Sequence, residues 1–296
     1  MILVTGATGT TGREVLRGLP AGLPVRVLAR DPARVERAAA RRAEIVTGDY
    51  GDPRSLDRAL RGVSRAFLLT NRVGGDDDAR FLRAARSAGV RHVVKVSAAA
   101  VADTDADDLV TRWQRANEDL LVNSGMRWTL LRPRAFMSNT LSWAPPIAAE
   151  RVVRALYGTS VNACVDPRDV AAAAVCALTE DGHEGRIHTL TGPEPISAVE
   201  QTAQLARLLG SPLRFEELSP DRARALLGRR HPAAVVEALL ASARRQRAGA
   251  KVRVEDTVHR VTGRPARPFA TWAEDHLAAF RADEPTTTPA LTPLAG

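Results

Sequence analysis

The stretch ILVTGATGTTGREVL, residues 2–16, decides the fold. The run ILVT is typical of a strand, and a helical pattern begins directly after a turn that contains Gly6, Gly9 and Gly12. In such a strand–turn–helix unit, the first glycine makes the tight turn and the second lets backbone approach a pyrophosphate. The third lets the helix pack closely on the strand, and the helix amino terminus attracts anions. We therefore predict a dinucleotide-binding turn at this position.

Short apolar runs continue along the first 132 residues and alternate with helical patterns. We predict strands at 2–5, 25–29, 44–48, 65–70, 92–97 and 128–132. Strands without polar alternation, separated by helices, indicate a parallel sheet that is covered on both faces. The predicted fold is α/β, with a Rossmann-type doubly wound parallel sheet whose ligand lies at the carboxyl ends of the strands.

The alternating pattern ends after residue 132, and a second unit is expected there. We predict a dinucleotide-binding core at 1–135, completed by a helix and a strand at about 166–192. A small, mostly helical C-terminal substrate lobe would comprise 136–165 and 193–282, with a loop at 133–147 and two helices joined at His231 and Pro232. The tail 283–296 is rich in Thr and Pro and is predicted to be disordered.

Composition excludes several classes of function. The chain has 296 residues and a net charge of +8, and Lys95 and Lys251 are its only lysines. Its arginines are dispersed and interleaved with acids, which argues against a nucleic-acid surface. No apolar run approaches the roughly 20 residues that span a bilayer, and no cluster of His, Cys and Asp has metal-ligand spacing. We expect a cytoplasmic monomer or homodimer without nucleic-acid, membrane or metal partners.

The end of the second predicted strand indicates which dinucleotide binds. An NAD-selective site carries an acid there, which accepts hydrogen bonds from the ribose 2′-hydroxyl. This sequence has Arg30, whose guanidinium suits a 2′-phosphate, with Arg13 and Arg34 as possible helpers. Asp31 follows and could either cap the next helix or compete for the ribose. The pattern favours NADP, bound as NADPH.

Taken together, the motifs resemble the short-chain dehydrogenase/reductase superfamily, and more closely its atypical, NmrA-like branch. They are GATGTTG (6–12), VRVLARDP (25–32), GDYGDPRSLDRALRGV (48–63), AGVRHVVKVSA (88–98), SGMRWTLLRPRAFMSN (124–139), DPRDVAAAAV (166–175) and HEGRIHTLTGPEPIS (183–197). The resemblance covers nearly the whole chain, to about Phe280. It implies that Asp49 contacts the adenine with Tyr50 beside it, and that Lys95 and Ser97 lie near the nicotinamide. The cofactor-binding residues expected from the turn and the resemblance are Gly6, Thr8, Gly9, Thr10, Thr11, Gly12, Arg30, Asp49, Tyr50, Leu69, Thr70, Lys95, Ser97, Gln114, Pro133 and Phe136.

One expected motif is missing from the predicted helix at 109–121. Enzymes of the superfamily protonate the product alkoxide with a Tyr-x-x-x-Lys pair, whose spacing places both side chains on one helical face. Aligning the end of this helix on that pattern puts Gln114 at the lysine position and Val110 at the tyrosine position. Neither Tyr50 nor Tyr157 has a lysine four residues later. The usual proton donor is therefore absent.

Two functions remain open without the dyad. The first is an NADPH-dependent ketoreductase that acts on a ketone or quinone of a bulky aromatic secondary metabolite, with the proton taken from water or substrate. Some polyketide-tailoring ketoreductases of the superfamily, including the angucyclinone type, lack the tyrosine. The second is a non-catalytic, NADP(H)-sensing redox regulator that acts through a protein partner. For the enzyme, the catalytic candidates are Ser97, Gln114 and Asn117, and the substrate-contacting candidates are Trp113, Phe136, Met137, Asn139 and Trp143.

Overall fold

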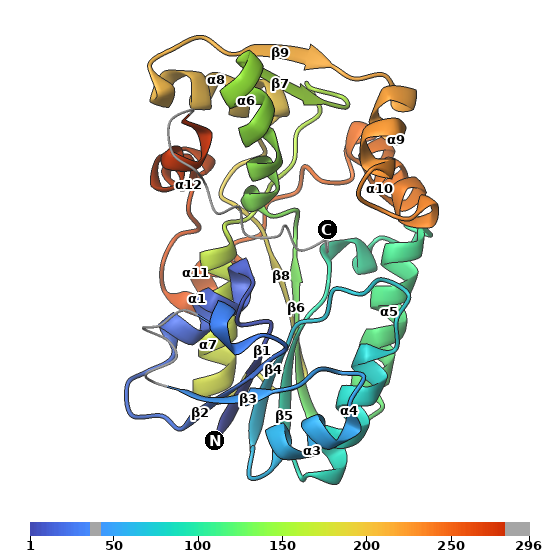
Figure 1. Ribbon diagram of the computed structural model, residues 1–296, viewed down its shortest axis with the longest axis vertical. Coiled ribbons are helices and arrows are strands. Elements are labelled where there is room, and N and C mark those ends of the chain that lie inside the picture. Colours follow the sequence, from blue (N-terminus) through green and yellow to red (C-terminus); the bar gives the residue numbers. More distant parts are fainter. Residues whose placement is uncertain (36–42, 282–296) are drawn as a thin grey trace.

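The computed structural model describes residues 1–35 and 43–281. Figure 1 shows a sheet flanked by helices in the lower half and a smaller unit stacked above it, which we call the upper lobe. The tail for which disorder is predicted, 283–296, lies outside the described residues.

The sheet of the lower half contains seven parallel strands in the order β3-β2-β1-β4-β5-β6-β8. In β1, Val4 pairs with Val27 of β2 on one side and with Phe67 of β4 on the other. The predicted doubly wound sheet is confirmed, and each predicted strand lies close to an observed one. Their bounds are β1 (Ile2–Thr5), β2 (Val25–Ala29), β3 (Ala43–Thr47), β4 (Arg65–Leu68), β5 (His92–Val96), β6 (Arg127–Pro133) and β8 (Arg186–Leu190).

Helices cover both faces of this sheet, which explains why its strands read as continuous apolar runs. Adjacent side chains of a strand point to opposite faces. Leu3 and Val4 accordingly enter two different buried clusters, and both are fully buried. One cluster lies under α1 (Thr10–Gly18) and α7 (Pro167–Thr179), and the other under α3 (Pro53–Leu60), α4 (Asp77–Ser87) and α5 (Leu109–Val122). A further short helix, α11 (Thr257–Thr262), packs on α7.

The upper lobe corrects two expectations. The segment predicted as a loop at 133–147 contains η3 (Met137–Trp143) and α6 (Ala144–Glu150). Pro145 and Pro146 lie in the first turn of α6, where the N–H that proline lacks would have no helical partner. The lobe also contains a parallel pair of short strands, β7 (Val152–Ala155) and β9 (Arg214–Glu217), which a purely helical pattern does not anticipate.

The predicted helices of the upper lobe are otherwise confirmed. Ser197 and Glu200 form a capping box at the start of α8 (Ala198–Leu209), and Gly210 ends that helix in the left-handed conformation. The two helices expected around His231 and Pro232 are α9 (Pro220–Gly228) and α10 (Ala233–Arg247). The remaining helix of the lobe is α12 (Phe269–Asp275), and shorter 3₁₀ turns are η1 (Pro32–Arg34), η2 (Ala99–Ala102) and η4 (Leu277–Phe280).

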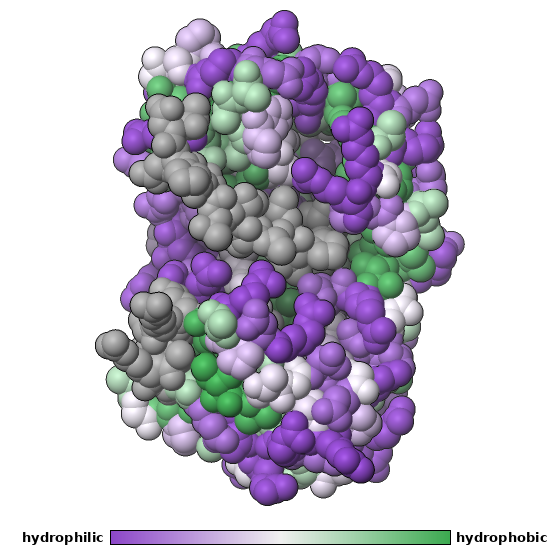
Figure 2. All heavy atoms as spheres, viewed as in Figure 1, coloured by the Kyte–Doolittle hydropathy of each residue, from purple (hydrophilic) through white to green (hydrophobic). Residues whose placement is uncertain are grey.

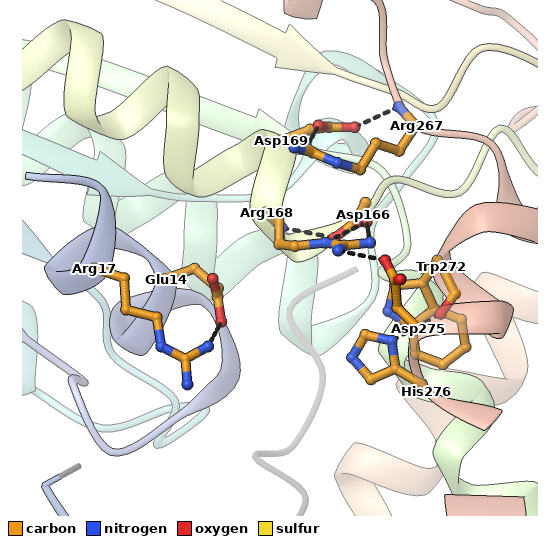
Figure 3. Close-up of polar contacts among 9 residues, drawn as sticks. All are labelled: Glu14, Arg17, Asp166, Arg168, Asp169, Arg267, Trp272, Asp275 and His276. Carbon is orange, nitrogen blue, oxygen red and sulfur yellow. Dashed lines mark hydrogen bonds and ion pairs between the residues drawn. The ribbon is translucent and has the colours of Figure 1, made fainter. Parts of the chain in front are cut away.

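A group of charged side chains at the start of α7 joins the sheet to the upper lobe (Figure 3). Asp166 caps α7 by accepting a hydrogen bond from the backbone N–H of Arg168, and the Arg168 guanidinium also pairs with Asp275 of α12 at 2.6 Å. Asp169, one turn along the same helix, accepts the backbone N–H of Arg267 at 2.7 Å. Because both aspartates are buried and paired, they fix α12 and the lobe above the carboxyl ends of the strands.

The surface is mainly polar. Figure 2 shows hydrophilic residues over most of the visible face, with apolar residues in small separate groups. Within 1–35 and 43–281, the structure contains no helix that is both long and apolar enough to cross a membrane.

Candidate functional site

The glycine turn has the geometry that the sequence predicts. Gly6 has a φ of +67°, a conformation that glycine adopts without strain. A Cβ atom on Gly12 would lie 2.2 Å from the carbonyl oxygen of Gly6, so only glycine fits there. Gly9 caps α1 without a side-chain hydrogen bond, which leaves the N–H groups of the first helical turn directed at the cleft.

A cavity of about 500 Å³ opens beside this turn, at the point where the strand order reverses between β1 and β4. Such switch points bind nucleotides in doubly wound sheets. The cavity brings together seven of the residues expected at the cofactor: Gly6, Thr8, Gly9, Arg30, Asp49, Tyr50 and Leu69. Arg34, expected as a helper, also lines it, and the lining includes Asn71, Arg72, Asp77 and Arg80, which sequence reasoning missed. Those four lie at the start of α4 and in the loop before it, which follows β4 at the switch point.

The wall of this cavity is held together by its own hydrogen bonds. The Tyr50 hydroxyl donates to the Leu69 carbonyl oxygen at 3.0 Å, and Asp49 accepts the N–H of Gly51 at 2.6 Å. The other tyrosine, Tyr157, lies in the upper lobe with the Arg247 guanidinium 5.0 Å from its ring centre. Neither phenol occupies the position of the missing catalytic tyrosine.

Lys95 forms a buried ion pair. Its Nζ atom lies 2.5 Å from Asp78 of α4, and both side chains are fully buried. The second oxygen of Asp78 accepts a hydrogen bond from the Thr70 hydroxyl at 2.5 Å. Two buried charges are tolerated when they pair with each other, as Lys95 and Asp78 do here. A contact of Lys95 or Thr70 with the cofactor therefore stays a prediction.

Three polar side chains collect where β5 meets α5. Ser97 follows the last residue of β5, and Gln114 and Asn117 are one turn apart on α5. All three are buried, yet the Ser97 hydroxyl, both amide atoms of Gln114 and the Asn117 Nδ2 atom have no hydrogen-bond partner among the described residues. A buried polar group without a partner costs about 1–3 kcal/mol. These are therefore the atoms that a bound molecule with hydroxyl or carboxamide groups would satisfy.

A bidentate ion pair fixes the helix that carries two of these residues. Arg132 of β6 donates to both carboxylate oxygens of Glu118 on α5, at 2.9 and 2.5 Å. The carboxylate is nearly buried, with 5% of its side chain exposed. Because Glu118 follows Gln114 by four residues, the pair holds the face of α5 that bears Gln114 against the end of β6. The sequence contains both residues, but nothing in their separation of 14 positions indicates the contact.

The residues expected to contact substrate divide between the cleft and the core. Phe136 lies partly buried after β6 and pairs with Val165 through a backbone bridge. Trp113 is buried and donates its indole N–H to the Gly75 carbonyl oxygen. Met137 is buried in the core of the upper lobe, against which Trp143 packs. Asn139 is partly exposed in η3.

The described residues fit a nicotinamide dinucleotide at both ends. The glycine cradle, which a Cβ atom at Gly12 would fill, offers backbone N–H groups to a pyrophosphate. The cavity beside it is lined by Asp49 and Arg30, where we expect the adenosine to lie. The unpaired atoms of Ser97 and Gln114 offer hydrogen bonds to a ribose and a carboxamide.

Comparison with known proteins identifies the family of this chain. Residues 6–181 match the family model described as NAD(P)H-binding. The chain belongs to this NAD(P)H-binding family. The match confirms the expected nicotinamide dinucleotide, NAD(P)H.

Two relatives that match nearly the whole chain are named as reductases. The chain is 58% identical to the (4-alkanoyl-5-oxo-2,5-dihydrofuran-3-yl)methyl phosphate reductase of Streptomyces griseus, over 95% of this chain and 99% of that protein. It is 38% identical to the NAD(P)H azoreductase of Xenophilus azovorans, over 95% and 100% of the two chains. The NADPH-dependent quinone oxidoreductase of Escherichia coli, solved in complex with NADPH, shares the fold with a TM-score of 0.80 and 28% identity, over 94% and 100% of the chains.

The chain is accordingly an NAD(P)H-dependent oxidoreductase. These relatives favour the enzyme over the non-catalytic redox regulator that the missing dyad left open.

Proposed function

We propose that this enzyme reduces a conjugated acceptor with NADPH, and that its substrate is a butenolide bearing an acyl group and a phosphate ester. The observation that carries the proposal is the absence of a side-chain proton donor at positions 110 and 114, where Val110 and Gln114 stand in a full-length relative of a butenolide phosphate reductase. The reaction must then be one that needs positioning more than acid catalysis.

The chemistry of the relatives' named substrates supports this choice. A 4-alkanoyl-5-oxo-2,5-dihydrofuran has a ring double bond conjugated with two carbonyl groups. Bound NADPH supplies a hydride, and at the ring carbon that carries the methyl phosphate this hydride would leave an enolate spread over two oxygens. Water can protonate such an enolate at the neighbouring carbon, which gives the saturated ring. Quinones and azo compounds likewise place the added electron pair on heteroatoms away from the site of attack.

The chain's own residues would hold the acceptor next to the nicotinamide in the orientation that hydride transfer needs. Gln114 would hydrogen-bond the nicotinamide ribose, where the superfamily uses lysine, and Ser97 would orient a carbonyl oxygen. Asn117, on the next turn of α5, would offer its unpaired Nδ2 atom to the same bound molecule. The Arg132–Glu118 pair is a positioning pair, because it acts on α5 and touches neither substrate nor cofactor. Phe136, partly exposed at the end of β6, would pack against the flat acceptor.

A quinone or a bulky aromatic ketone of the polyketide type is the second candidate substrate. The similarity to the quinone oxidoreductase of Escherichia coli over 94% of the chain favours it. Both candidates share the same requirement, which is a π system that accepts hydride without a phenolic acid.

A substrate panel tests the proposal. NADPH oxidation is measured with an acyl butenolide, its phosphate ester, a quinone and an unconjugated ketone of equal size, and the product made with NADPH deuterated at C4 is examined by NMR. We expect turnover of the conjugated acceptors. In the butenolide product, deuterium should appear at the ring carbon that carries the methyl phosphate. Reduction of the unconjugated ketone to an alcohol at an equal rate would overturn the proposal.

A further inference from the structure

Two cations, Arg134 and Lys251, lie at the carboxyl end of β6, beneath the upper lobe, and neither forms an ion pair with a described residue. Arg134 directly follows β6, and its guanidinium reaches the carbonyl oxygen of Ala250 at 3.4 Å. Lys251 directly follows Ala250. Its carbonyl oxygen accepts a hydrogen bond from the N–H of Ala163, and its ammonium donates to the Ser242 hydroxyl at 2.7 Å. The loop after α10 therefore brings Lys251 next to Arg134.

Arg245, next to these two cations, forms close ion pairs, whereas Arg134 and Lys251 interact with carboxylates only at longer range, Arg134 with Glu255 and Asp103 and Lys251 with Asp108. Arg245 of α10 lies 2.8 Å from Asp108, the residue that caps α5, and 3.6 Å from Asp103. Through this contact α10 packs on the upper end of α5 (Figure 1). In the part of the chain that the structure describes, no carboxylate lies within 4 Å of Arg134 or Lys251, and the buried Nε atom of Arg134 has no hydrogen-bond partner.

We propose that Arg134 and Lys251 form the site for the phosphate group of the substrate. As residues, Arg134 and Lys251 are both partly exposed at the carboxyl end of β6. A guanidinium and an ammonium together match a phosphate dianion in charge and in hydrogen-bond donors. The inference rests on the proposed function, because in that substrate the phosphate lies one carbon away from the ring atom that accepts hydride. The site must then lie near the nicotinamide end of the cleft, as Arg134 does.

This site is separate from the one expected for the 2′-phosphate of NADPH. Arg30 follows β2, whereas Arg134 follows β6, and three strands lie between them in the sheet. At a strand spacing of about 4.8 Å, the two positions are roughly 19 Å apart along the edge of the sheet. One phosphate cannot bridge them.

The surroundings of Lys251 should make phosphate binding at this site depend on pH. Burial, with Arg245 and Arg134 nearby, lowers the pKa of Lys251 to about 8, and Asp108 opposes the shift. Lys251 is then charged below about pH 8 and loses its proton above it. We expect the affinity for a phosphate ester to fall as the pH rises through 8. Lys251→Arg should flatten this profile, because arginine stays protonated over the whole range.

The experiment compares a phosphorylated and an unphosphorylated acyl butenolide on four proteins: wild type, Arg134→Gln, Lys251→Met and Arg244→Gln. Arg244 is exposed on α10 and gives a control for the loss of one positive charge. For Arg134→Gln and Lys251→Met we expect KM for the phosphate ester to rise about 10- to 100-fold. The kcat/KM for the hydroxymethyl analogue should change less than about threefold, and Arg244→Gln should match wild type. Equal losses with both substrates, or no loss with either, would overturn the site.

Binding of the phosphate ester to the NADP-loaded enzyme, measured by calorimetry, separates this inference from the proposed function. If wild type reduces no conjugated acceptor but binds the ester more tightly than Arg134→Gln does, the proposed function fails and the site stands. If wild type reduces both butenolides with equal KM and binds both equally, the function stands and the site fails. Unchanged melting temperatures of the two variants would exclude unfolding as the cause of a loss.

Discussion

The two ends of the cleft are built in different ways. The adenosine end, around Gly6 and Tyr50, is formed by backbone and by side chains that already bond one another, as Tyr50 does with Leu69. The nicotinamide end, around Ser97 and Gln114, contains buried polar atoms that have no partner among residues 1–35 and 43–281. The wall of the first end is held by its own hydrogen bonds, while the second carries the cost of unpaired groups until a molecule binds.

The difference indicates where selectivity for the substrate arises. A preformed backbone cradle binds any dinucleotide phosphate, so it adds affinity and leaves the choice of reaction open. Unpaired side chains at the other end discriminate, because a molecule that fails to satisfy them leaves their desolvation cost in place. The comparison yields four tests, in order of decreasing effect.

The largest effect is expected at the adenosine end. Gly12→Ala would place a Cβ atom 2.2 Å from the Gly6 carbonyl oxygen, so the backbone of the turn must move. We expect NADPH binding to weaken by about 3 kcal/mol, roughly 100-fold, in a fluorescence titration. Gly18→Ala in the same helix is the control, because its Cβ would meet only the movable side chain of Val175, at 3.2 Å. Equal losses in both variants would show that α1 as a whole, and not the cradle, is responsible.

A smaller effect is expected where the adenosine end selects its dinucleotide. Arg30 is exposed and lines the cavity, and we expect it to bind the 2′-phosphate. Arg30→Asp should weaken NADPH binding roughly 10- to 100-fold and leave NADH binding much less affected. Arg86→Asp makes the same charge change at the far end of α4 and should leave the preference unaltered. An unchanged ratio of the two dissociation constants in Arg30→Asp would refute the role of Arg30.

The nicotinamide end should tolerate a change that would be severe in an enzyme with the tyrosine–lysine pair. Gln114→Ala removes hydrogen bonds but no proton donor, so kcat should fall less than about tenfold. Gln204→Ala in α8 of the upper lobe is the matched control and should leave kcat as in wild type. A loss near a thousandfold for Gln114→Ala would mean that the amide takes part in the chemical step.

The smallest expected effect concerns the pH dependence of stability, and it arises from two buried histidines outside the cleft. Burial lowers the pKa of His92 and of His188 to about 4, so both stay neutral in the folded protein at pH values where the unfolded chain binds protons. The free energy of unfolding should therefore decrease as the pH falls from about 6.5 toward 4. Each kcal/mol lost should lower the melting temperature by roughly 2–4 °C. His92→Asn should flatten this dependence, and the exposed His259→Asn should not. NADPH affinity should not follow the melting curve, since His92 begins β5 at the edge opposite the cleft.

The adenosine end could be predicted from the sequence because its parts are local. Gly6, Gly9 and Gly12 lie within one turn, and Arg30 follows its strand directly. The nicotinamide end was predicted less fully. Gln114 was placed through the family pattern, but the ion pair between Arg132 and Glu118 and the meeting of Arg134 with Lys251 join residues 14 and 117 positions apart. No periodicity or spacing reports such contacts.

The sequence by itself determined the strand and helix pattern, the glycine cradle and the missing proton donor. Each of these depends on the chemistry of single residues and their immediate neighbours: backbone freedom at glycine, strand burial in apolar runs, and the presence or absence of a phenol. Only the tertiary structure decided that Lys95 pairs with Asp78 and that Arg134 lies next to Lys251. It also decided that polar atoms of Ser97, Gln114 and Asn117 are buried without a hydrogen-bond partner among the described residues. Charge pairing and desolvation depend on distances in space, and these arise only when strands and helices far apart in the chain pack against one another.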